Sequence, residues 1–334
     1  MCIFQMDGLL VGNEKGKMIY NSKILNITHY DLDGCVCSII ISNMFDTVKT
    51  VPVSYNNLDQ TILNVGKTDE LSGYDVIITT DINLNKLHID HLTNLGVIYF
   101  HLDHHEDSDH IENGRNIIVD QTKCGAMVTM DFMNINFKCD LSHLNNLILA
   151  TDSYDRWIHN NIWGKPLNYI YDMYGFESFK NRFMKGFDPK ELNGGEIEYL
   201  QRVNTEIQKE LDRVKKSMII SDSSKIAIIY SSTKHMNDMS DFILKDKNLG
   251  VEIVFGINTG SFKCHMRTSR SDINLGKMLT FLGVGGGHKK AASFNNKNIV
   301  MNKTLTDPIK HDLIFSDIEK YAEILEKQFP DLCR

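Results

Sequence analysis

The sequence has few of the features that mark specialised classes of protein. No stretch approaches 18 uninterrupted apolar residues, so we expect no membrane span. The N-terminus has no basic segment followed by a long apolar one, so we expect no signal peptide and a cytoplasmic protein. The seven cysteines include no CxxC pair, which argues against both a disulfide framework and a zinc finger.

Positive charge is also scarce. The formal net charge is −7, whereas binding to long double-stranded nucleic acid normally needs a basic face. Short anionic substrates need only a few cations and are not excluded. A hydrophobic fraction of 42% and a length of 334 residues predict a folded chain of about two domains.

Buried strands and helices alternate through the first half of the chain. The predicted strands are residues 23–28, 48–53, 75–80, 97–102 and 116–119. The predicted helices are residues 35–45, 57–65, 84–95, 125–133 and 142–150. This order is typical of an α/β domain with a doubly wound, mainly parallel sheet. Residues 160–190 show no clear periodicity.

A second α/β pattern follows an amphipathic helix at 193–217. Strands are predicted at 226–230, 251–257 and 262–267, helices near 239–244 and at 273–282, and a last helix at 316–328. We therefore divide the chain into an N-terminal extension (1–22), a catalytic domain (23–190), a helical linker (191–217), a smaller α/β domain (218–300) and a tail (301–334).

Acidic and imidazole side chains cluster after the predicted strands. They are His29, Asp31 and Asp33, then Asp81, then Asp103, His104 and His105, while Asp152 follows a helix. In parallel sheets ligands bind beyond the carboxyl ends of the strands. Any one aspartate is equally explained as a helix N-cap, and the histidine run alone as a polar loop. Together, oxygen and imidazole ligands suit two manganese, magnesium or iron ions, a template for phosphoester hydrolysis.

A glycine run, Gly285 to Gly287, precedes His288 in the second α/β region. It is explained either as a flexible turn or as a segment whose backbone N–H groups approach a phosphate. In the second case His288 and Arg267 would add charged donors. The chain has neither a GxSxG elbow nor a GxGxxG fingerprint after its first strand.

These motifs, in this order, resemble the DHH phosphoesterase family, whose naming motif stands here as Asp103-His104-His105. His29-x-Asp31-x-Asp33 is similar to its first motif, Thr80-Asp81 to its second and Ala150-Thr151-Asp152 to its fourth. The segment from Gly285 to Ala292 resembles the hallmark of the DHH-associated C-terminal domain, and Arg267-Thr268 its Arg-Ser element.

The resemblance implies a role for each residue and an active site between the two domains. One metal, with manganese favoured, would be held by His29, Asp31 and Asp81. The second would be held by Asp33, Asp81, His104 and Asp152. His105 would contact the scissile phosphate and Asp103 would support the site. The rest of the nucleotide would be bound by Gly285, Gly286, Gly287, His288 and Arg267. Val284 and Ser293 depart from the glycines of many relatives.

Family members differ in substrate, and the compact length favours the nanoRNase group. The resemblance thus implies hydrolysis of two- to five-nucleotide RNAs to nucleoside monophosphates. Alternatives are a cyclic dinucleotide or its linear product, and 3′-phosphoadenosine 5′-phosphate. Single-stranded DNA and an inactive nucleotide-binding scaffold are further alternatives. The expected partner is a short oligonucleotide or dinucleotide, not a membrane, and a homodimer is compatible with the sequence.

Overall fold

The computed structural model describes residues 22–105, 114, 116–137, 139–221, 225–260, 263–281 and 285–295. The N-terminal extension, apart from Ser22, and the helix predicted at 316–328 lie outside the described residues. The chain divides into two compact units between Leu200 and Gln201, a point inside helix α7 (Gly194–Ser217). Each unit is built around one sheet.

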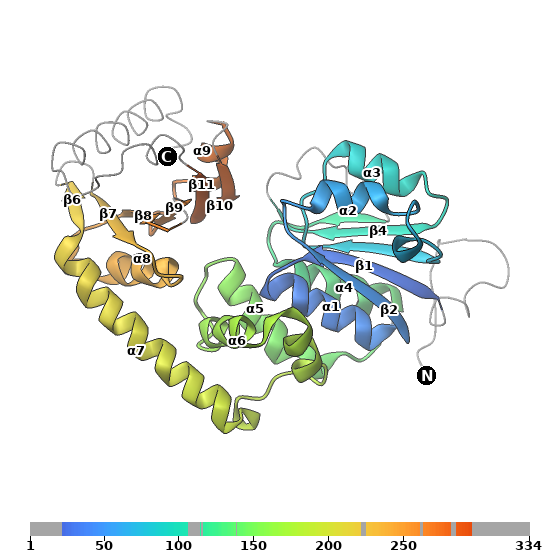
Figure 1. The fold of residues 1–334 in the computed structure, drawn as a ribbon, viewed down its shortest axis with the longest axis horizontal. Coiled ribbons are helices and arrows are strands. Elements are labelled where there is room, and N and C mark those ends of the chain that lie inside the picture. Colours follow the sequence, from blue (N-terminus) through green and yellow to red (C-terminus); the bar gives the residue numbers. More distant parts are fainter. Residues whose placement is uncertain are drawn as a thin grey trace. The chain divides into compact units, whose positions relative to one another are not determined.

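The sheet of the first unit is parallel throughout, with strand order β2-β1-β3-β4-β5 (Figure 1). Its strands are β1 (Lys23–His29), β2 (Thr47–Val53), β3 (Val76–Thr80), β4 (Ile98–Asp103) and β5 (Ile117–Val119). Every residue of β3 is buried, as expected for a central strand covered on both faces. The predicted parallel sheet is confirmed.

Helices cover both faces of this sheet (Figure 1). One layer contains α1 (Leu32–Met44), α4 (Gly125–Phe137), α5 (Asn145–Asp155) and α6 (Gly164–Phe183), and the other α2 (Leu58–Asn64) and α3 (Lys86–Thr93). Successive residues of β1 pack alternately into the cores on the two faces of the sheet, because strand side chains alternate between faces. Ile24 packs with α1, whereas Leu25 packs on the opposite side with Leu58.

The segment without clear periodicity contains helix α6, which is interrupted at Gly175. Gly175 has φ +69°, a conformation that glycine adopts without strain. Buried residues lie on both sides of the interruption, among them Ile170 and Phe179. A broken helix buried in this way has no regular apolar stripe, which explains why the pattern was not recognisable.

The second unit contains a mixed sheet with strand order β10-β11-β9-β8-β7-β6. Its strands are β6 (Ile219–Ser221), β7 (Ile226–Ser231), β8 (Ile253–Asn258), β9 (Lys263–Thr268), β10 (Gly285–His288) and β11 (Ala291–Asn295). Strands β7 and β8 pair in parallel and the other pairs are antiparallel. Helix α8 (Met236–Lys245) connects β7 to β8, and α9 (Leu275–Phe281) precedes β10.

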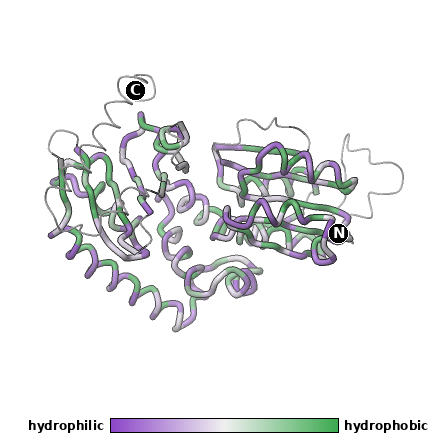
Figure 2. The backbone as a smooth tube through the Cα atoms, turned by 45° about the horizontal axis from the view of Figure 1, so that its top comes forward, coloured by the Kyte–Doolittle hydropathy of each residue, from purple (hydrophilic) through white to green (hydrophobic). Residues whose placement is uncertain are grey.

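Short 3-10 helices complete the described secondary structure: η2 (Asp69–Leu71), η4 (Ser142–Leu144), η5 (Pro189–Glu191) and η6 (Lys247–Leu249). Hydrophobic residues lie along the strands of both sheets, whereas hydrophilic and hydrophobic residues alternate along α7 (Figure 2). In α7 the buried positions Val203, Ile207, Leu211 and Val214 recur three or four residues apart. None of the helices in the described ranges has the length and apolar character needed to cross a membrane.

The glycine run is a strand and not a flexible turn, so that interpretation was wrong. Gly285 to His288 form β10, which pairs with β11 across a two-residue connection, Lys289 and Lys290. A Cβ at Gly285 would overlap the backbone of Ser293 on the facing strand. Glycine therefore permits the close approach of the two strands.

Candidate metal centre

The acidic and imidazole clusters meet at the carboxyl edge of the parallel sheet. The strand order reverses between β1 and β3, the position where open α/β sheets bind ligands. His29 ends β1, Asp81 directly follows β3 and Asp103 ends β4. The order of the strands thus brings together residues that lie far apart in the chain.

The turn into α1 positions the first two carboxylates. Asp31 is the N-cap of the helix and accepts a hydrogen bond from the backbone N–H of Gly34 at 3.0 Å. Its other oxygen lies 2.7 Å from Nδ1 of His29. Asp33 follows in the first turn and is buried. A Cβ at Gly34 would overlap the carbonyl oxygen of His29, so this turn requires glycine.

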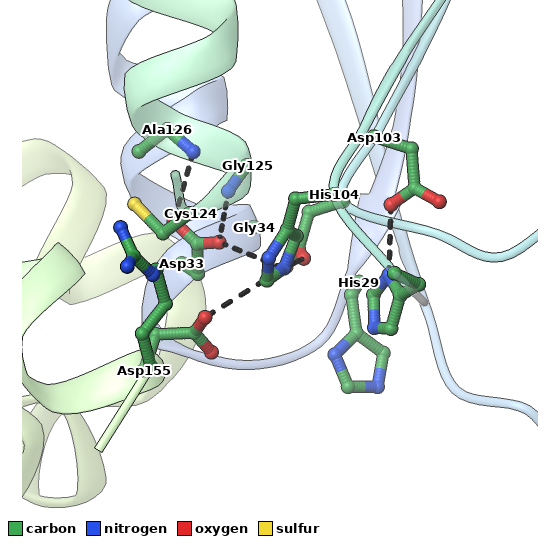
Figure 3. A network of polar contacts seen from close by, with 12 residues as sticks. His29, Asp33, Gly34, Asp103, His104, Cys124, Gly125, Ala126 and Asp155 are labelled. Carbon is green, nitrogen blue, oxygen red and sulfur yellow. Dashed lines mark hydrogen bonds and ion pairs between the residues drawn. The ribbon is translucent and has the colours of Figure 1, made fainter. Parts of the chain in front are cut away.

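Asp33 is held by the N-terminus of a second helix, α4. The backbone N–H groups of Gly125 and Ala126 donate to its two carboxylate oxygens at 2.6 and 2.9 Å (Figure 3). Free N–H groups at a helix start stabilise a nearby negative charge. These two hydrogen bonds therefore fix the position of the buried carboxylate.

The imidazole of His104 lies at the centre of three carboxylates. Its Nε2 is 3.1 Å from Asp81 Oδ1, 3.6 Å from Asp33 Oδ2 and 3.6 Å from Asp155 Oδ2. In Figure 3 dashed lines join this ring to Asp33 and to Asp155, which is the last residue of α5. One nitrogen cannot satisfy three acidic groups by hydrogen bonding, so their negative charge is largely uncompensated.

Asp81 is shared by two parts of the cluster. One group that could hold a cation consists of His29, Asp31 and Asp81, and another of Asp81, His104 and His105. A third consists of Asp33, His104 and Asp155, and in each group the ligand atoms lie within 4.8 Å of one another. Asp81 has φ +52°, uncommon outside glycine, and its Oδ2 is buried without a hydrogen-bond partner. An unpartnered carboxylate oxygen between two such groups is what a bridging metal ligand provides.

Burial and mutual repulsion set the pKa values of these carboxyl groups. Burial and the nearby charge of Asp155 raise the pKa of Asp33 to about 7. Burial and Asp31 raise the pKa of Asp155 to about 7. Burial, followed by Asp33, raises the pKa of Asp81 well above its ordinary value. A cation among them would reverse this effect by favouring the ionised forms.

The imidazole of His104 remains neutral and able to act as a ligand. Burial and the neighbouring His105 lower the pKa of His104 below its ordinary value. Neutral imidazole together with carboxylate oxygens is a donor set suited to manganese, magnesium or iron. The residues at this edge of the sheet therefore fit a centre for two divalent metal ions.

His105 differs from His104 in its environment. Its Nδ1 lies 2.7 Å from Oδ1 of Asp103, whose side chain is fully buried. Although burial opposes it, the charge of Asp103 raises the pKa of His105 to about 9. Burial alone would raise the pKa of Asp103, but the charge of His105 outweighs it and holds this pKa below its usual range. Asp103 therefore orients the ring of His105 and favours its protonated form.

The structure places Asp155, which was not recognised in the sequence, beside His104 and Asp33. Asp152 instead accepts a hydrogen bond from the backbone N–H of Cys124 at 2.9 Å and lies 3.3 Å from Arg156 Nη1. The other predicted metal ligands all belong to the three groups described above: His29, Asp31, Asp33, Asp81 and His104. The helix α5 runs one turn beyond its predicted end, and this added turn contains Asp155.

The predicted substrate-binding residues lie in register in the second sheet. Ala291 of β11 pairs with Arg267 of β9 on one side and with His288 of β10 on the other. Gly285, Gly286 and Gly287 continue β10 from His288. The guanidinium of Arg267 is buried and donates to Asn237 Oδ1 at 2.7 Å and to the carbonyl of Met266 at 2.7 Å. These residues therefore lie together on three neighbouring strands of the second unit.

Comparison with known proteins agrees with the centre described above. Residues 23–151 match the DHH family, N-terminal domain. This segment is similar to a DHH domain. It contains every candidate ligand except Asp152 and Asp155, and it includes the Asp103-His104-His105 motif. The match indicates an enzyme that hydrolyses phosphoester bonds, as the motifs predicted.

Solved structures share the fold of the DHH domain and of the region that follows it. RecJ in complex with Mn²⁺ from Thermus thermophilus has a TM-score of 0.55 at 16% identity, over 93% of this chain and 53% of that chain. The pGpG-specific phosphodiesterase PggH from Vibrio cholerae has a TM-score of 0.52 at 13% identity, over 88% of this chain and 98% of its own. An exopolyphosphatase-related protein from Bacteroides fragilis has a TM-score of 0.53 at 14% identity, over 91% and 94%. The comparison with curated proteins gives no match.

Proposed function

We propose that this protein is a metal-dependent phosphodiesterase that hydrolyses short oligonucleotides to nucleoside monophosphates. The observation that carries the proposal is that Asp81 belongs to two groups of candidate ligands, within or next to the segment that matches the DHH family. Two cations at such a site activate water and neutralise phosphoryl oxygens during phosphoester hydrolysis. Manganese is the metal that we favour, with magnesium or iron as alternatives.

The residues of the site divide into two sets of ligands. His29, Asp31 and Asp81 would hold one cation, and Asp33, Asp81, His104 and Asp155 would hold the other. Asp155 takes the place that the sequence motif assigned to Asp152, because its Oδ2 is 3.6 Å from the shared ligand His104. The helix start at Gly125 orients Asp33, so this ligand is preorganised before a metal binds.

His105 and Asp103 act on the substrate side of the centre. The imidazolium of His105 would contact an oxygen of the scissile phosphate and stabilise the negative charge that grows during attack. Asp103, buried and 2.7 Å from Nδ1, fixes the ring and keeps its proton. Neither residue needs to move or to exchange a proton for this role.

The net charge of the chain and the printed name of one structural relative favour a short substrate. A net charge of −7 disfavours extended contact with a nucleic-acid backbone. The chain spans about half of Thermus thermophilus RecJ but nearly all of PggH, whose name specifies a linear dinucleotide. A linear dinucleotide such as pGpG is therefore our second candidate substrate. Arg267, Gly285 to Gly287 and His288 would bind the part of the nucleotide remote from the scissile bond.

A substrate panel with Mn²⁺ tests the proposal. It contains a diribonucleotide, a pentaribonucleotide, pGpG, a cyclic dinucleotide, 3′-phosphoadenosine 5′-phosphate, single-stranded DNA and tripolyphosphate. We expect turnover of the linear dinucleotides, loss of turnover in His104→Ala, and normal turnover in the matched variant His143→Ala, whose side chain is exposed outside the centre. Failure to hydrolyse any linear oligonucleotide, with the metal bound, would refute it.

A further inference from the structure

Two tyrosines beside the metal centre are exposed, although two of the candidate ligands, Asp33 and Asp81, are buried. The side chains of Tyr30 and Tyr55 are 53% and 54% exposed, whereas Asp33 and Asp81 are at most 2% exposed. Tyr30 lies between the ligands His29 and Asp31, and Tyr55 follows β2. Neither tyrosine is a member of the described hydrophobic cores.

The ring of Tyr30 is supported from beneath by other aromatic rings. It stacks on Phe176 with the centroids 5.8 Å apart and the planes at 23°, and its edge meets Tyr171 at 6.4 Å. Both supporting side chains are buried in the first unit. Tyr30 is thus held in place by a buried aromatic base and keeps more than half of its surface open.

Tyr55 is held against two of the three histidines of the site, His29 and His105. Its ring centroid is 5.3 Å from that of His29, and its hydroxyl lies 3.4 Å from Nε2 of His105. The loops that carry the two tyrosines are joined, because the backbone N–H of Tyr30 donates to the carbonyl of Val53 at 2.8 Å. The two tyrosines therefore lie on adjacent loops next to His29.

We propose that Tyr30 and Tyr55 bind the nucleobase next to the scissile phosphate by stacking. This inference rests on the proposed function, since it assigns a base to the substrate of the same site. Base–aromatic stacking accepts any base and adds affinity for each base bound. A polyphosphate chain has no aromatic ring and gains nothing from it. The two tyrosines would thus select nucleotides over other phosphoesters, whatever their base sequence.

Equilibrium binding measurements separate the contribution of the base to affinity from that of the phosphate. The ligands are adenosine 5′-monophosphate and ribose 5-phosphate, which share the phosphate and sugar, measured by calorimetry with Mn²⁺ present. We expect the wild-type protein to bind the mononucleotide at least roughly tenfold more tightly. In Tyr30→Leu and Tyr55→Leu this ratio should fall by roughly five- to tenfold each, with Mn²⁺ affinity unchanged. Tyr30→Phe and Tyr55→Phe keep the ring and should keep the ratio.

The exposed Leu87 on α3 provides a control, because Leu87→Ala removes a side chain that is 73% exposed outside the centre. Equal binding of the two ligands by the wild-type protein would overturn the inference without any variant, as would an unchanged ratio in both leucine variants. If the ratio responds as expected but no oligonucleotide is hydrolysed, the proposed function fails and base stacking stands. If oligonucleotides are hydrolysed but the wild-type protein binds the two ligands equally, the proposed function stands and base stacking fails.

Discussion

Gly125 lies directly against Asp81. A Cβ at position 125 would be 2.7 Å from Cβ of Asp81 and 3.0 Å from Oδ2 of Asp33. The glycine at the start of α4 therefore allows two ligands from different elements to approach each other, while its own N–H donates to Asp33. This contact makes the backbone of α4 part of the candidate metal centre.

We expect Gly125→Ala to weaken both the metal centre and the fold. The added methyl group must displace Asp81 or Asp33, which should lower Mn²⁺ affinity by roughly ten- to a hundredfold and stability by about 1–3 kcal/mol. Calorimetric titration with Mn²⁺ and urea unfolding measure the two effects. Gly194→Ala is the matched control, because a Cβ there would meet no atom within 4 Å. Unchanged Mn²⁺ affinity in Gly125→Ala would contradict the close contact.

Asp155 and Asp152 are distinguished by their contacts. Asp155→Asn removes a carboxylate beside His104 and should lower Mn²⁺ affinity and dinucleotide turnover by at least roughly a hundredfold. Asp152→Asn changes a residue that caps the backbone of Cys124 and should cost about 1 kcal/mol of stability. The measurements are metal titration, turnover and thermal unfolding of both variants. A loss of metal in Asp152→Asn alone would restore the assignment made from the motif.

Asp103 acts through His105, so its removal should affect turnover rather than metal binding. In Asp103→Asn the imidazole loses the negative charge that raises its pKa, and the contact at 2.7 Å that orients it becomes a weaker hydrogen bond to a neutral amide oxygen. We expect kcat for a dinucleotide to fall by roughly ten- to a hundredfold, with Mn²⁺ affinity as in the wild type. A parallel loss of both would show that Asp103 supports the metal ligands instead.

The sequence was sufficient to predict the parallel sheet, because strand and helix signals alternate and each strand is a short apolar run. It also predicted which strand ends carry the acidic and imidazole side chains of the candidate centre, since parallel strands end at one edge. It could not separate Asp152 from Asp155. The two are three residues apart and close on one helix face, and only the tertiary position of α5 determines which of them reaches His104.

Pairing between distant segments explains why the sequence did not predict a strand at the glycine run. Four residues rich in glycine have little preference for a strand, and β10 exists because β11 pairs with it and β9 pairs with β11 in turn. That registry, with Ala291 between Arg267 and His288, is a property of the sheet and not of any local pattern. The motif therefore indicated the family but not the structure of the glycine run.

Glu196 joins α6 to the start of α7, and its contribution to stability should depend on pH. Its carboxylate accepts hydrogen bonds from Arg182 at 2.9 Å and from the backbone N–H of Asn193 at 2.7 Å, and Asn193 caps the helix in return. Although burial opposes it, the hydrogen bond from Arg182 lowers the pKa of Glu196. A lowered pKa stabilises the folded state above the unfolded pKa of about 4.3 and loses this effect as pH falls through the folded value.

Glu196→Gln should therefore be less stable than the wild type by about 1–3 kcal/mol at pH 7, because it loses the charge that Arg182 binds. This difference should stay constant down to about pH 4.3 and shrink below it, as the wild-type carboxylate becomes protonated. Urea unfolding across this pH range measures it, and Glu198→Gln, exposed on the same helix, is the control. A difference that grows as the pH falls would mean that Glu196 is protonated in the folded protein, and the ion pair would not hold α7 in place.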